Sequence, residues 1–223
     1  MLRLVAFDMD GTLVDIPSSW ASVHAHFGAA NPEGLRQFMA YEIDDLEFIR
    51  SDIRIWWRHR PDLSIDEIEA ILDRAPIVPG AHDLMKGLRA RGVRTAIVSG
   101  GIDLLARRIG RELGIDIVLA NGFRVHPDGR LTGEGIVRVP IHRKEDVLAD
   151  LQSQLAIDPA ETASVGNSEI DVGLFRRSRV GVAFRPEDEI VERAATAVVR
   201  GPDIARVLDV LRDFPDDPAP RWA

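Results

Sequence analysis

Short apolar segments alternate with helical segments over most of this chain, and this alternation restricts the fold more than any other feature. The predicted strands are Leu2–Phe7, Arg94–Val98, Asp116–Leu119, Thr162–Val165, Val180–Phe184 and Ala197–Val199. The predicted helices between them are Ala81–Ala90, Ile102–Leu113, His142–Leu155, Ser168–Arg177, Glu187–Ala194 and Asp203–Leu211. Such an order forms a parallel sheet through right-handed crossovers, with helices on both faces. We therefore expect an α/β fold with a doubly wound, Rossmann-like parallel sheet.

Residues 15–78 interrupt the alternation, because this segment shows helical patterns and no strand pattern. Its predicted helices are Ser18–Ala30, Pro32–Tyr41, Asp44–His59 and Ser64–Ala75. We expect a small, all-helical cap domain inserted into a core made of residues 1–14 and 79–213. Within the core, Asn121–Val139 is typical of a β-hairpin that turns at Pro127-Asp128-Gly129. Residues 214–223, with three prolines and paired acids, are expected to form a frayed tail.

Composition narrows the possible functions. The chain has no cysteine, which excludes disulfides, thiolate zinc sites and cysteine nucleophiles. A net charge of −8 argues against a general nucleic-acid-binding protein. No apolar stretch approaches the roughly 20 residues that span a bilayer, and the apolar start is too short for a signal peptide. We expect a cytoplasmic protein with neither membrane nor nucleic acid as partner; nothing in the sequence indicates an oligomeric state.

Acidic and polar residues follow three of the predicted strands directly, at Asp8, at Ser99 and at Gly166-Asn167. In parallel sheets, ligands bind beyond the carboxyl ends of the strands, so these loops converge on one edge. A carboxylate such as Asp8 can attack phosphorus and form an aspartyl-phosphate. A second acid, Asp10, can protonate the leaving oxygen and later activate water. The alternative is that these acids, with Gly11, merely form a loop.

Four segments match, in order, the motifs of the haloacid dehalogenase superfamily: Asp8-Met9-Asp10-Gly11-Thr12, Val98-Ser99-Gly100-Gly101, Lys144, and Val165-Gly166-Asn167-Ser168-Glu169-Ile170-Asp171. The chain resembles the phosphoserine-phosphatase-like branch with a helical cap, over residues 1–16 and 76–213. The resemblance implies a Mg²⁺ cofactor, with Asp8 as nucleophile and metal ligand. It also implies that Asp10 is the acid/base and gives its carbonyl to the metal.

Phosphate binding is expected at the second and third motifs. The Ser99 hydroxyl and the free N–H groups near Gly100 suit phosphate oxygens, although a serine and glycines also commonly end a strand. Lys144 and Lys86 are the only lysines, beside 26 arginines. A compact point charge at Lys144 would offset the repulsion between Asp8 and a phosphate, a task for which arginine is a poor substitute. The alternative for Lys144 is a solvated residue in a first helical turn.

The fourth motif departs from the family at Asn167, where relatives usually have an aspartate that binds magnesium directly. An amide oxygen can also coordinate magnesium, with one negative charge fewer. Asp171 matches a second acid, which is expected to support the metal or the lysine, and we count it among the candidate metal residues. The alternative is that Asn167 or Ser168 caps a helix.

Other residues in the predicted cap are open to two interpretations. His24 and His26 lie on opposite sides of a helix, which favours surface histidines over a shared metal site. Trp56-Trp57 is expected to pack cap helices rather than to stack on nucleic acid. Arg50 and Arg54, one turn apart, are candidate ligands for a substrate carboxylate.

The expected function is hydrolysis of a small phosphorylated metabolite, with phosphoserine as the leading candidate and sugar phosphates as an alternative. Phosphoserine phosphatases carry a cap glutamate soon after the first motif, whereas this chain has Asp15-Ile16-Pro17-Ser18-Ser19-Trp20 there. Two further hypotheses are a weakly active, phosphate-binding regulatory protein on the same fold, and phosphoryl transfer to an acceptor other than water.

Overall fold

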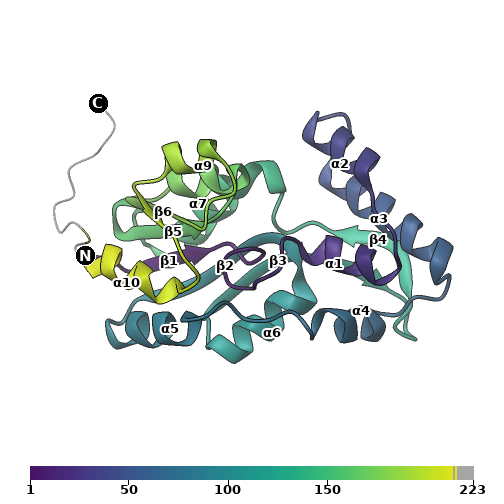
Figure 1. Cartoon of the computed structure of the whole chain (residues 1–223), viewed down its shortest axis with the longest axis horizontal. Coiled ribbons are helices and arrows are strands. Elements are labelled where there is room, and N and C mark those ends of the chain that lie inside the picture. The colour runs from purple at the N-terminus through teal and green to yellow at the C-terminus, as the bar shows by residue number, and fades with distance from the viewer. Residues whose placement is uncertain (213, 215–223) are drawn as a thin grey trace.

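A seven-stranded sheet forms the centre of the molecule in the computed structural model, which describes residues 1–212 and residue 214 (Figure 1). The strands are β1 (Leu4–Phe7), β2 (Arg94–Ile102), β3 (Ile117–Val125), β4 (Leu131–Ile136), β5 (Thr162–Gly166), β6 (Val180–Phe184) and β7 (Ala197–Val199). Their order is β4-β3-β2-β1-β5-β6-β7. The pair β3–β4 is antiparallel and the other neighbouring pairs are parallel. The predicted α/β class with a doubly wound parallel sheet is confirmed.

Helices cover both faces of the sheet (Figure 1). One face packs against α5 (Ala81–Ala90), α6 (Asp103–Leu113) and α10 (Val207–Arg212); the other packs against α7 (Lys144–Leu155), α8 (Val172–Arg176) and α9 (Glu189–Ala194). The side chains of β1 alternate between these layers, because successive residues of a strand point to opposite faces. Val5 and Phe7 belong to the first apolar cluster, and Leu4 and Ala6 to the second. All four residues of β1 are buried, as expected for a parallel strand that is covered on both faces.

The strand β1 lies between β2 and β5 and is parallel to both. Phe7 is in register with Ile97 on β2 and with Val165 on β5. The residues that follow these positions, Asp8, Ser99 and Asn167, therefore emerge at one edge of the sheet. This is the point where the strand order reverses, which is where open α/β sheets bind their ligands.

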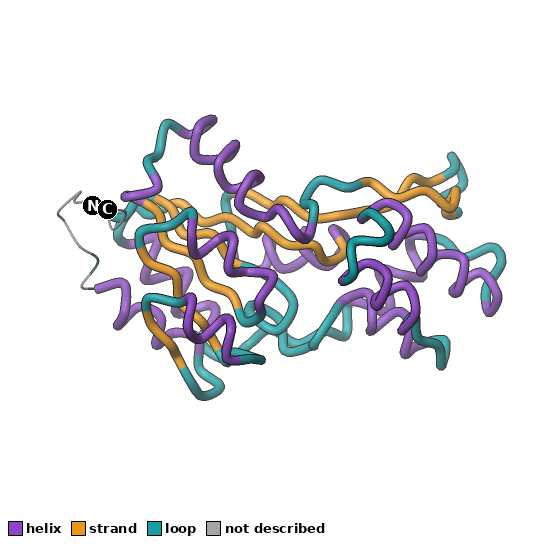
Figure 2. The backbone as a smooth tube through the Cα atoms, turned by 90° about the horizontal axis from the view of Figure 1, so that it is seen from above, coloured by secondary structure: helices purple, strands orange, loops and turns teal. Residues whose placement is uncertain are grey.

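Four helices form the cap at one end of the molecule, beyond that edge (Figures 1 and 2). They are α1 (Ser19–His26), α2 (Pro32–Met39), α3 (Asp45–His59) and α4 (Ile65–Leu72). The hairpin of β3 and β4 extends along the cap instead of staying with the core. A Cβ at Gly135 would lie 2.7 Å from Ile49 Cγ2, and the Leu131 amide donates to the Leu63 carbonyl at 3.0 Å. Tertiary packing thus assigns this hairpin to the cap side.

Several predicted boundaries differ from the structure. The strand β2 continues through Ser99-Gly100-Gly101 to Ile102, with an irregular register that follows Ser99. The predicted strand Asp116–Leu119 and the first arm of the hairpin are one strand, β3, which pairs with β2 and then with β4.

At the carboxyl terminus, Phe214 was predicted to begin the tail, but it is 7% exposed and belongs to the core; residues 215–223 lie outside the described residues. None of the described helices is both long enough and apolar enough to cross a membrane.

Candidate active site

Asp8 occupies the first position after β1, where its amide donates to the Val165 carbonyl at 2.9 Å. The residue is 6% exposed and lines a large cavity. The oxygen Oδ1 accepts a hydrogen bond from Lys144 Nζ at 2.8 Å. Within the described part of the chain, Oδ2 accepts none. One carboxylate oxygen is therefore held in place, and the other is available to attack a substrate.

Asp10 is oriented by Ser19, which lies at the start of α1. The amide and the hydroxyl of Ser19 both donate to Asp10 Oδ2, at 2.8 and 2.7 Å. The other oxygen, Oδ1, is buried and has no partner among the described residues. Burial raises the pKa of the Asp10 carboxyl, and the hydrogen bonds from Ser19 only partly oppose this effect. The raised pKa favours a protonated carboxyl, whose proton can be carried by Oδ1 and donated into the cavity.

Lys144 is buried between two carboxylates. It is 3% exposed, and its ammonium donates to Asp8 Oδ1 and to Asp171 Oδ1, both at 2.8 Å. Burial alone would lower the pKa of Lys144, but Asp171 and Asp8 raise it above its usual value, so the side chain stays charged. Of the two interpretations of Lys144, the structure supports the buried point charge beside Asp8.

Asp171 uses both of its carboxylate oxygens within the protein. Oδ1 accepts from Lys144, while Oδ2 accepts from the amides of Asn167 and Ser168 at 2.9 and 3.2 Å. The residue is completely buried and is not among those that line the cavity. This geometry favours a role in holding Lys144 and the fourth motif over direct ligation of a metal.

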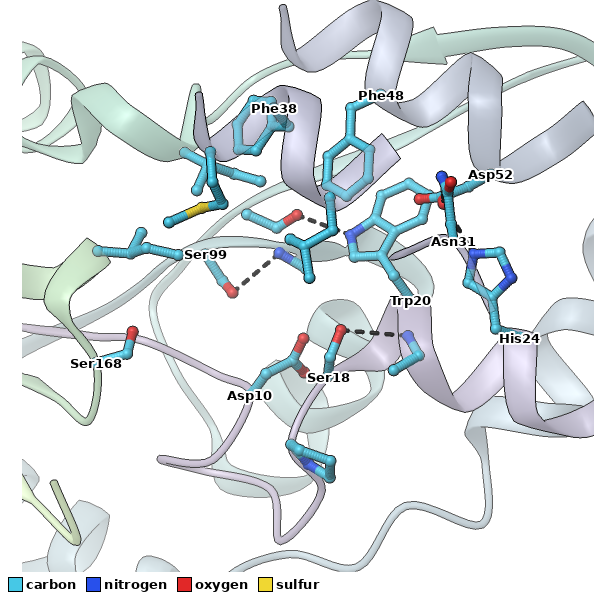
Figure 3. A pocket seen from close by; sticks show the side chains of 18 of the residues that line it. Asp10, Ser18, Trp20, His24, Asn31, Phe38, Phe48, Asp52, Ser99 and Ser168 are labelled. Carbon is cyan, nitrogen blue, oxygen red and sulfur yellow. Dashed lines mark hydrogen bonds and ion pairs between the residues drawn. The ribbon is translucent and has the colours of Figure 1, made fainter. Parts of the chain in front are cut away.

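Ser99 and Gly100, the two predicted phosphate-binding residues, lie near the carboxyl end of β2. The Ser99 oxygen accepts from the Gly101 amide at 3.1 Å, which leaves its hydroxyl hydrogen free to donate into the cavity (Figure 3). Side chains cannot replace the glycines here. A Cβ at Gly101 would lie 2.8 Å from Asp10 Oδ2, and one at Gly100 would lie 2.5 Å from Ile141 Cγ1. Both predicted phosphate-binding residues line the same cavity as Asp8.

Asn167 lines the cavity, and of the two residues considered as helix caps it is Ser168 that caps the following turn, Glu169–Asp171. Asn167 Oδ1 accepts from the Thr12 hydroxyl at 3.2 Å, and its Nδ2 donates to Glu187 Oε1 at 2.9 Å. Gly11, at φ +72°, makes room for this amide, because a Cβ there would lie 2.4 Å from Asn167 Nδ2. The amide oxygen therefore points toward Thr12 of the first motif.

The cluster contains more buried negative charge than its single cation offsets. Burial raises the pKa of Asp8 to about 7, and the Lys144 ammonium only partly counteracts it. Among the described residues, no group of three or more histidine, cysteine, aspartate or glutamate side chains is arranged to hold a metal ion. Asp8 and Asn167 instead both line the cavity, and their carboxylate and amide oxygens are the kind of ligand that Mg²⁺ prefers. The residues fit a divalent cation that would balance this charge.

The cavity lies between the core and the cap and has a volume of about 620 Å³. Asp8, Asp10, Ser99, Lys144 and Asn167 line its core side. Apolar residues of the cap line much of the remainder: Trp20, Leu35, Phe38, Met39 and Phe48 (Figure 3). The cap can therefore exclude water from a substrate and contact its leaving group.

Arg50 and Arg54 are not brought to the cavity. Arg50 pairs with Glu134 of β4 at 2.8 Å, and Arg54 pairs with Glu47 at 2.6 Å. Neither is among the residues that line the cavity, so the geometry gives no support to their binding a substrate carboxylate.

The prediction of a surface histidine is wrong for His24, which is 6% exposed and is hydrogen-bonded to Asp52. His26 is exposed as predicted. Trp56 is buried in the cap, stacked on Trp20 with ring centroids 5.9 Å apart.

Three cavity-associated residues were missed in the sequence: Ser19, Asp52 and Glu187. Glu187 carried a signal, since it follows β6 closely, and β6 lies beside β5 at the same sheet edge. Ser19 gave no signal beyond that of a helix start, where serine is common. Asp52 gave no signal, because an aspartate in an amphipathic helix usually faces solvent.

Comparisons with known proteins identify the family of this chain. Residues 5–176 match the family described as haloacid dehalogenase-like hydrolase. The phosphoserine phosphatase of Methanocaldococcus jannaschii is 27% identical over 217 residues, which cover 94% of this chain and 98% of that protein. That of Archaeoglobus fulgidus is 26% identical over 212 residues, which cover 94% of this chain but only 60% of the relative.

A solved structure described as a phospho-aspartyl intermediate analogue of phosphoserine phosphatase has a TM-score of 0.78 and 25% identity, and covers 94% of this chain and 98% of its own. The expectation of an enzyme of the phosphatase type is confirmed by these matches. The chain belongs to the haloacid dehalogenase-like hydrolase family.

Proposed function

We propose that this protein is a magnesium-dependent phosphomonoester hydrolase that acts through an aspartyl-phosphate. The observation that carries the proposal is that Asp8 and Asp10 line one cavity and each has a carboxylate oxygen without a hydrogen-bond partner among the described residues, while Lys144 holds the other oxygen of Asp8. A nucleophile and a general acid in such proximity are what phosphomonoester cleavage requires.

The reaction has two steps. Asp8 Oδ2 attacks phosphorus, the bond from phosphorus to the ester oxygen breaks, and Asp10 gives its proton to the departing alkoxide. Asp10 then takes a proton from a water molecule that attacks phosphorus, and the bond to Asp8 breaks to release phosphate. Lys144 offsets the negative charge of the phosphate oxygens, and the Ser99 hydroxyl donates a hydrogen bond to one of them. Bound Mg²⁺, held by Asp8, Asn167 and the Asp10 carbonyl, would supply further charge neutralisation.

The substrate is a small phosphorylated metabolite. Phosphoserine is a candidate because similar proteins are named phosphoserine phosphatases, and sugar phosphates are the alternative. The test is phosphate release from a panel of phosphomonoesters with and without Mg²⁺, with purified Asp8→Asn protein as control. Release by wild type alone supports the proposal, and equal release by the variant contradicts it. The cytoplasmic location stays a prediction.

A further inference from the structure

A buried polar cluster lies at the cap side of the cavity, away from the catalytic carboxylates. Asp52 of α3 is 2% exposed, yet it lines the cavity together with His24 and Asn31. Figure 3 shows these three side chains grouped beside Trp20, with Asp10 and Ser99 on the other side of the view. No step of the proposed reaction uses this cluster.

Hydrogen bonds fix one oxygen of Asp52 and leave the other open. Trp56 Nε1 donates to His24 Nδ1 at 3.1 Å, so Nδ1 is the acceptor and Nε2 is the ring nitrogen that can donate. His24 Nε2 then donates to Asp52 Oδ1 at 2.8 Å, and Asn31 Nδ2 donates to the same oxygen at 2.7 Å. Within the described part of the chain, Asp52 Oδ2 accepts no hydrogen bond.

The cavity that Asp52 lines has a largely aromatic wall. Phe38 and Phe48 stack with ring centroids 4.8 Å apart, and Trp20 completes an aromatic wall (Figure 3). A carboxylate oxygen in such an environment is unfavourable unless a donor or a cation pairs with it. Aromatic faces also attract organic cations.

Positive charge is scarce around the cavity. Lys144 is the one lysine or arginine among the described residues that line it. Its ammonium already pairs with two carboxylates, those of Asp8 and Asp171. A carboxylate on the leaving group would therefore meet Asp52 and aromatic rings without a cation to balance it. An ammonium group would meet both an anion and aromatic faces.

We propose that Asp52 binds an ammonium group on the leaving alcohol, so that the preferred substrate is the phosphomonoester of an amino alcohol without a carboxylate. This inference rests on the proposed phosphatase function and defines its substrate class. His24 and Asn31 act as positioning residues, because they hold Asp52 and do not themselves need to touch the substrate. The competing interpretation is that Asp52 only connects α1, α3 and the turn before α2.

The first test uses wild-type enzyme with Mg²⁺ and matched pairs of substrates. Each ω-aminoalkyl phosphate, from two to six carbons, is compared with the alkyl phosphate of the same length, and phosphoethanolamine is compared with phosphoserine. We expect kcat/KM to favour the amine at least about tenfold at the length that reaches Asp52, a factor that corresponds to about 1.4 kcal/mol. We also expect phosphoethanolamine to be preferred over phosphoserine. No preference for the amine at any length, or a preference for phosphoserine, would overturn the inference.

The second test changes the cluster. Asp52→Asn keeps an acceptor for His24 and Asn31 but removes the charge, so the ratio of kcat/KM for amine over alkyl substrate should fall at least about tenfold. Glu47→Gln, on the same helix and paired with Arg54 outside the cavity, is the matched control and should keep the wild-type ratio. An unchanged ratio in folded Asp52→Asn protein would mean that Asp52 is only structural.

A binding measurement separates this inference from the proposed reaction. Calorimetry on Asp8→Asn protein compares an ω-aminoalkyl phosphate with its alkyl partner and needs no turnover. If no phosphomonoester is hydrolysed but the amine still binds more tightly, the proposed function fails and the binding site stands. If hydrolysis occurs while the paired ligands bind equally, only the binding site is refuted.

Discussion

Asn167 Nδ2 lies 2.9 Å from Glu187 Oε1, so an amide in the fourth motif is paired with a carboxylate at the rim of the same cavity. A carboxylate in place of Asn167 would face Glu187 without a proton between them. The negative charge that is absent at Asn167 is therefore present on its partner, Glu187.

Changing both residues should strengthen magnesium binding more than changing one. Asn167→Asp adds a negative charge near Asp8, but the new carboxylate repels that of Glu187. When Glu187→Gln is added, the glutamine amide can donate a hydrogen bond to the new carboxylate, in the direction opposite to that of the wild type. We expect the double variant to lower the half-saturating Mg²⁺ concentration about tenfold, a gain of about 1.4 kcal/mol, and to exceed the single variant. Activity titration and Mg²⁺-dependent thermal stabilisation both measure this. Identical magnesium dependence in all three proteins would show that position 167 is not a ligand.

Replacing Asp8, the proposed nucleophile, should abolish turnover without unfolding the protein. Asp8→Asn retains the side-chain shape and leaves Lys144 bonded to Asp171. We expect kcat to fall by about three orders of magnitude or more, since covalent catalysis is lost. Phosphate release is measured beside circular dichroism of the same preparation. Activity near that of wild type would refute Asp8 as the nucleophile.

The buried lysine should not tolerate arginine. Lys144 Nζ is 2.8 Å from both Asp8 and Asp171, and a planar guanidinium cannot replace a point charge in that space. Lys144→Arg should lose most of its activity, while Lys86→Arg, at an exposed position, should retain it. Lys144→Met should lower the free energy of unfolding by about 3–5 kcal/mol, because buried carboxylates lose their partner. The opposite ranking of the two arginine variants would show that Lys86 is the functional lysine.

Burial of Asp8 predicts a pH-dependent stability in the absence of metal. Its pKa rises from 3.8 to about 7 in the folded state, so between these values the folded state binds more protons than the unfolded state. Stability must then decrease as the pH rises through this window. Urea unfolding should show wild type losing stability relative to Asp8→Asn from about pH 4 to about pH 7. A constant difference between the two proteins would refute the raised pKa.

Removing the Ser19 hydroxyl should change the acid/base step. The hydroxyl donates to Asp10 Oδ2 and helps to lower the Asp10 pKa, so its loss raises that pKa further. Because Asp10 acts in its protonated form, Ser19→Ala should move the alkaline limb of the kcat profile to higher pH. We also expect kcat to fall about tenfold through lost orientation. Ser22→Ala on the same helix is the control, and matching profiles for the two variants would contradict the role of Ser19.

The sequence by itself determined the fold class and the candidate catalytic residues of the core. The apolar run before Asp8 and the matching strands before Ser99 and Asn167 are local patterns, and strand direction alone brings their ends to one edge. Even Lys144, 136 residues from Asp8, was found, because its type is rare in this chain and its position matches the family.

Only the tertiary structure decided what lies opposite those residues. Asp52 and His24 are 28 residues apart and sit on different helices, and the packing of these helices makes them a buried pair. Arg50 was a candidate for the substrate until the hairpin brought Glu134, 84 residues away, against it. Helical periodicity specifies which face of a helix is apolar, but it does not specify which other segment covers that face. The cap side of the cavity depends on which segments cover those faces.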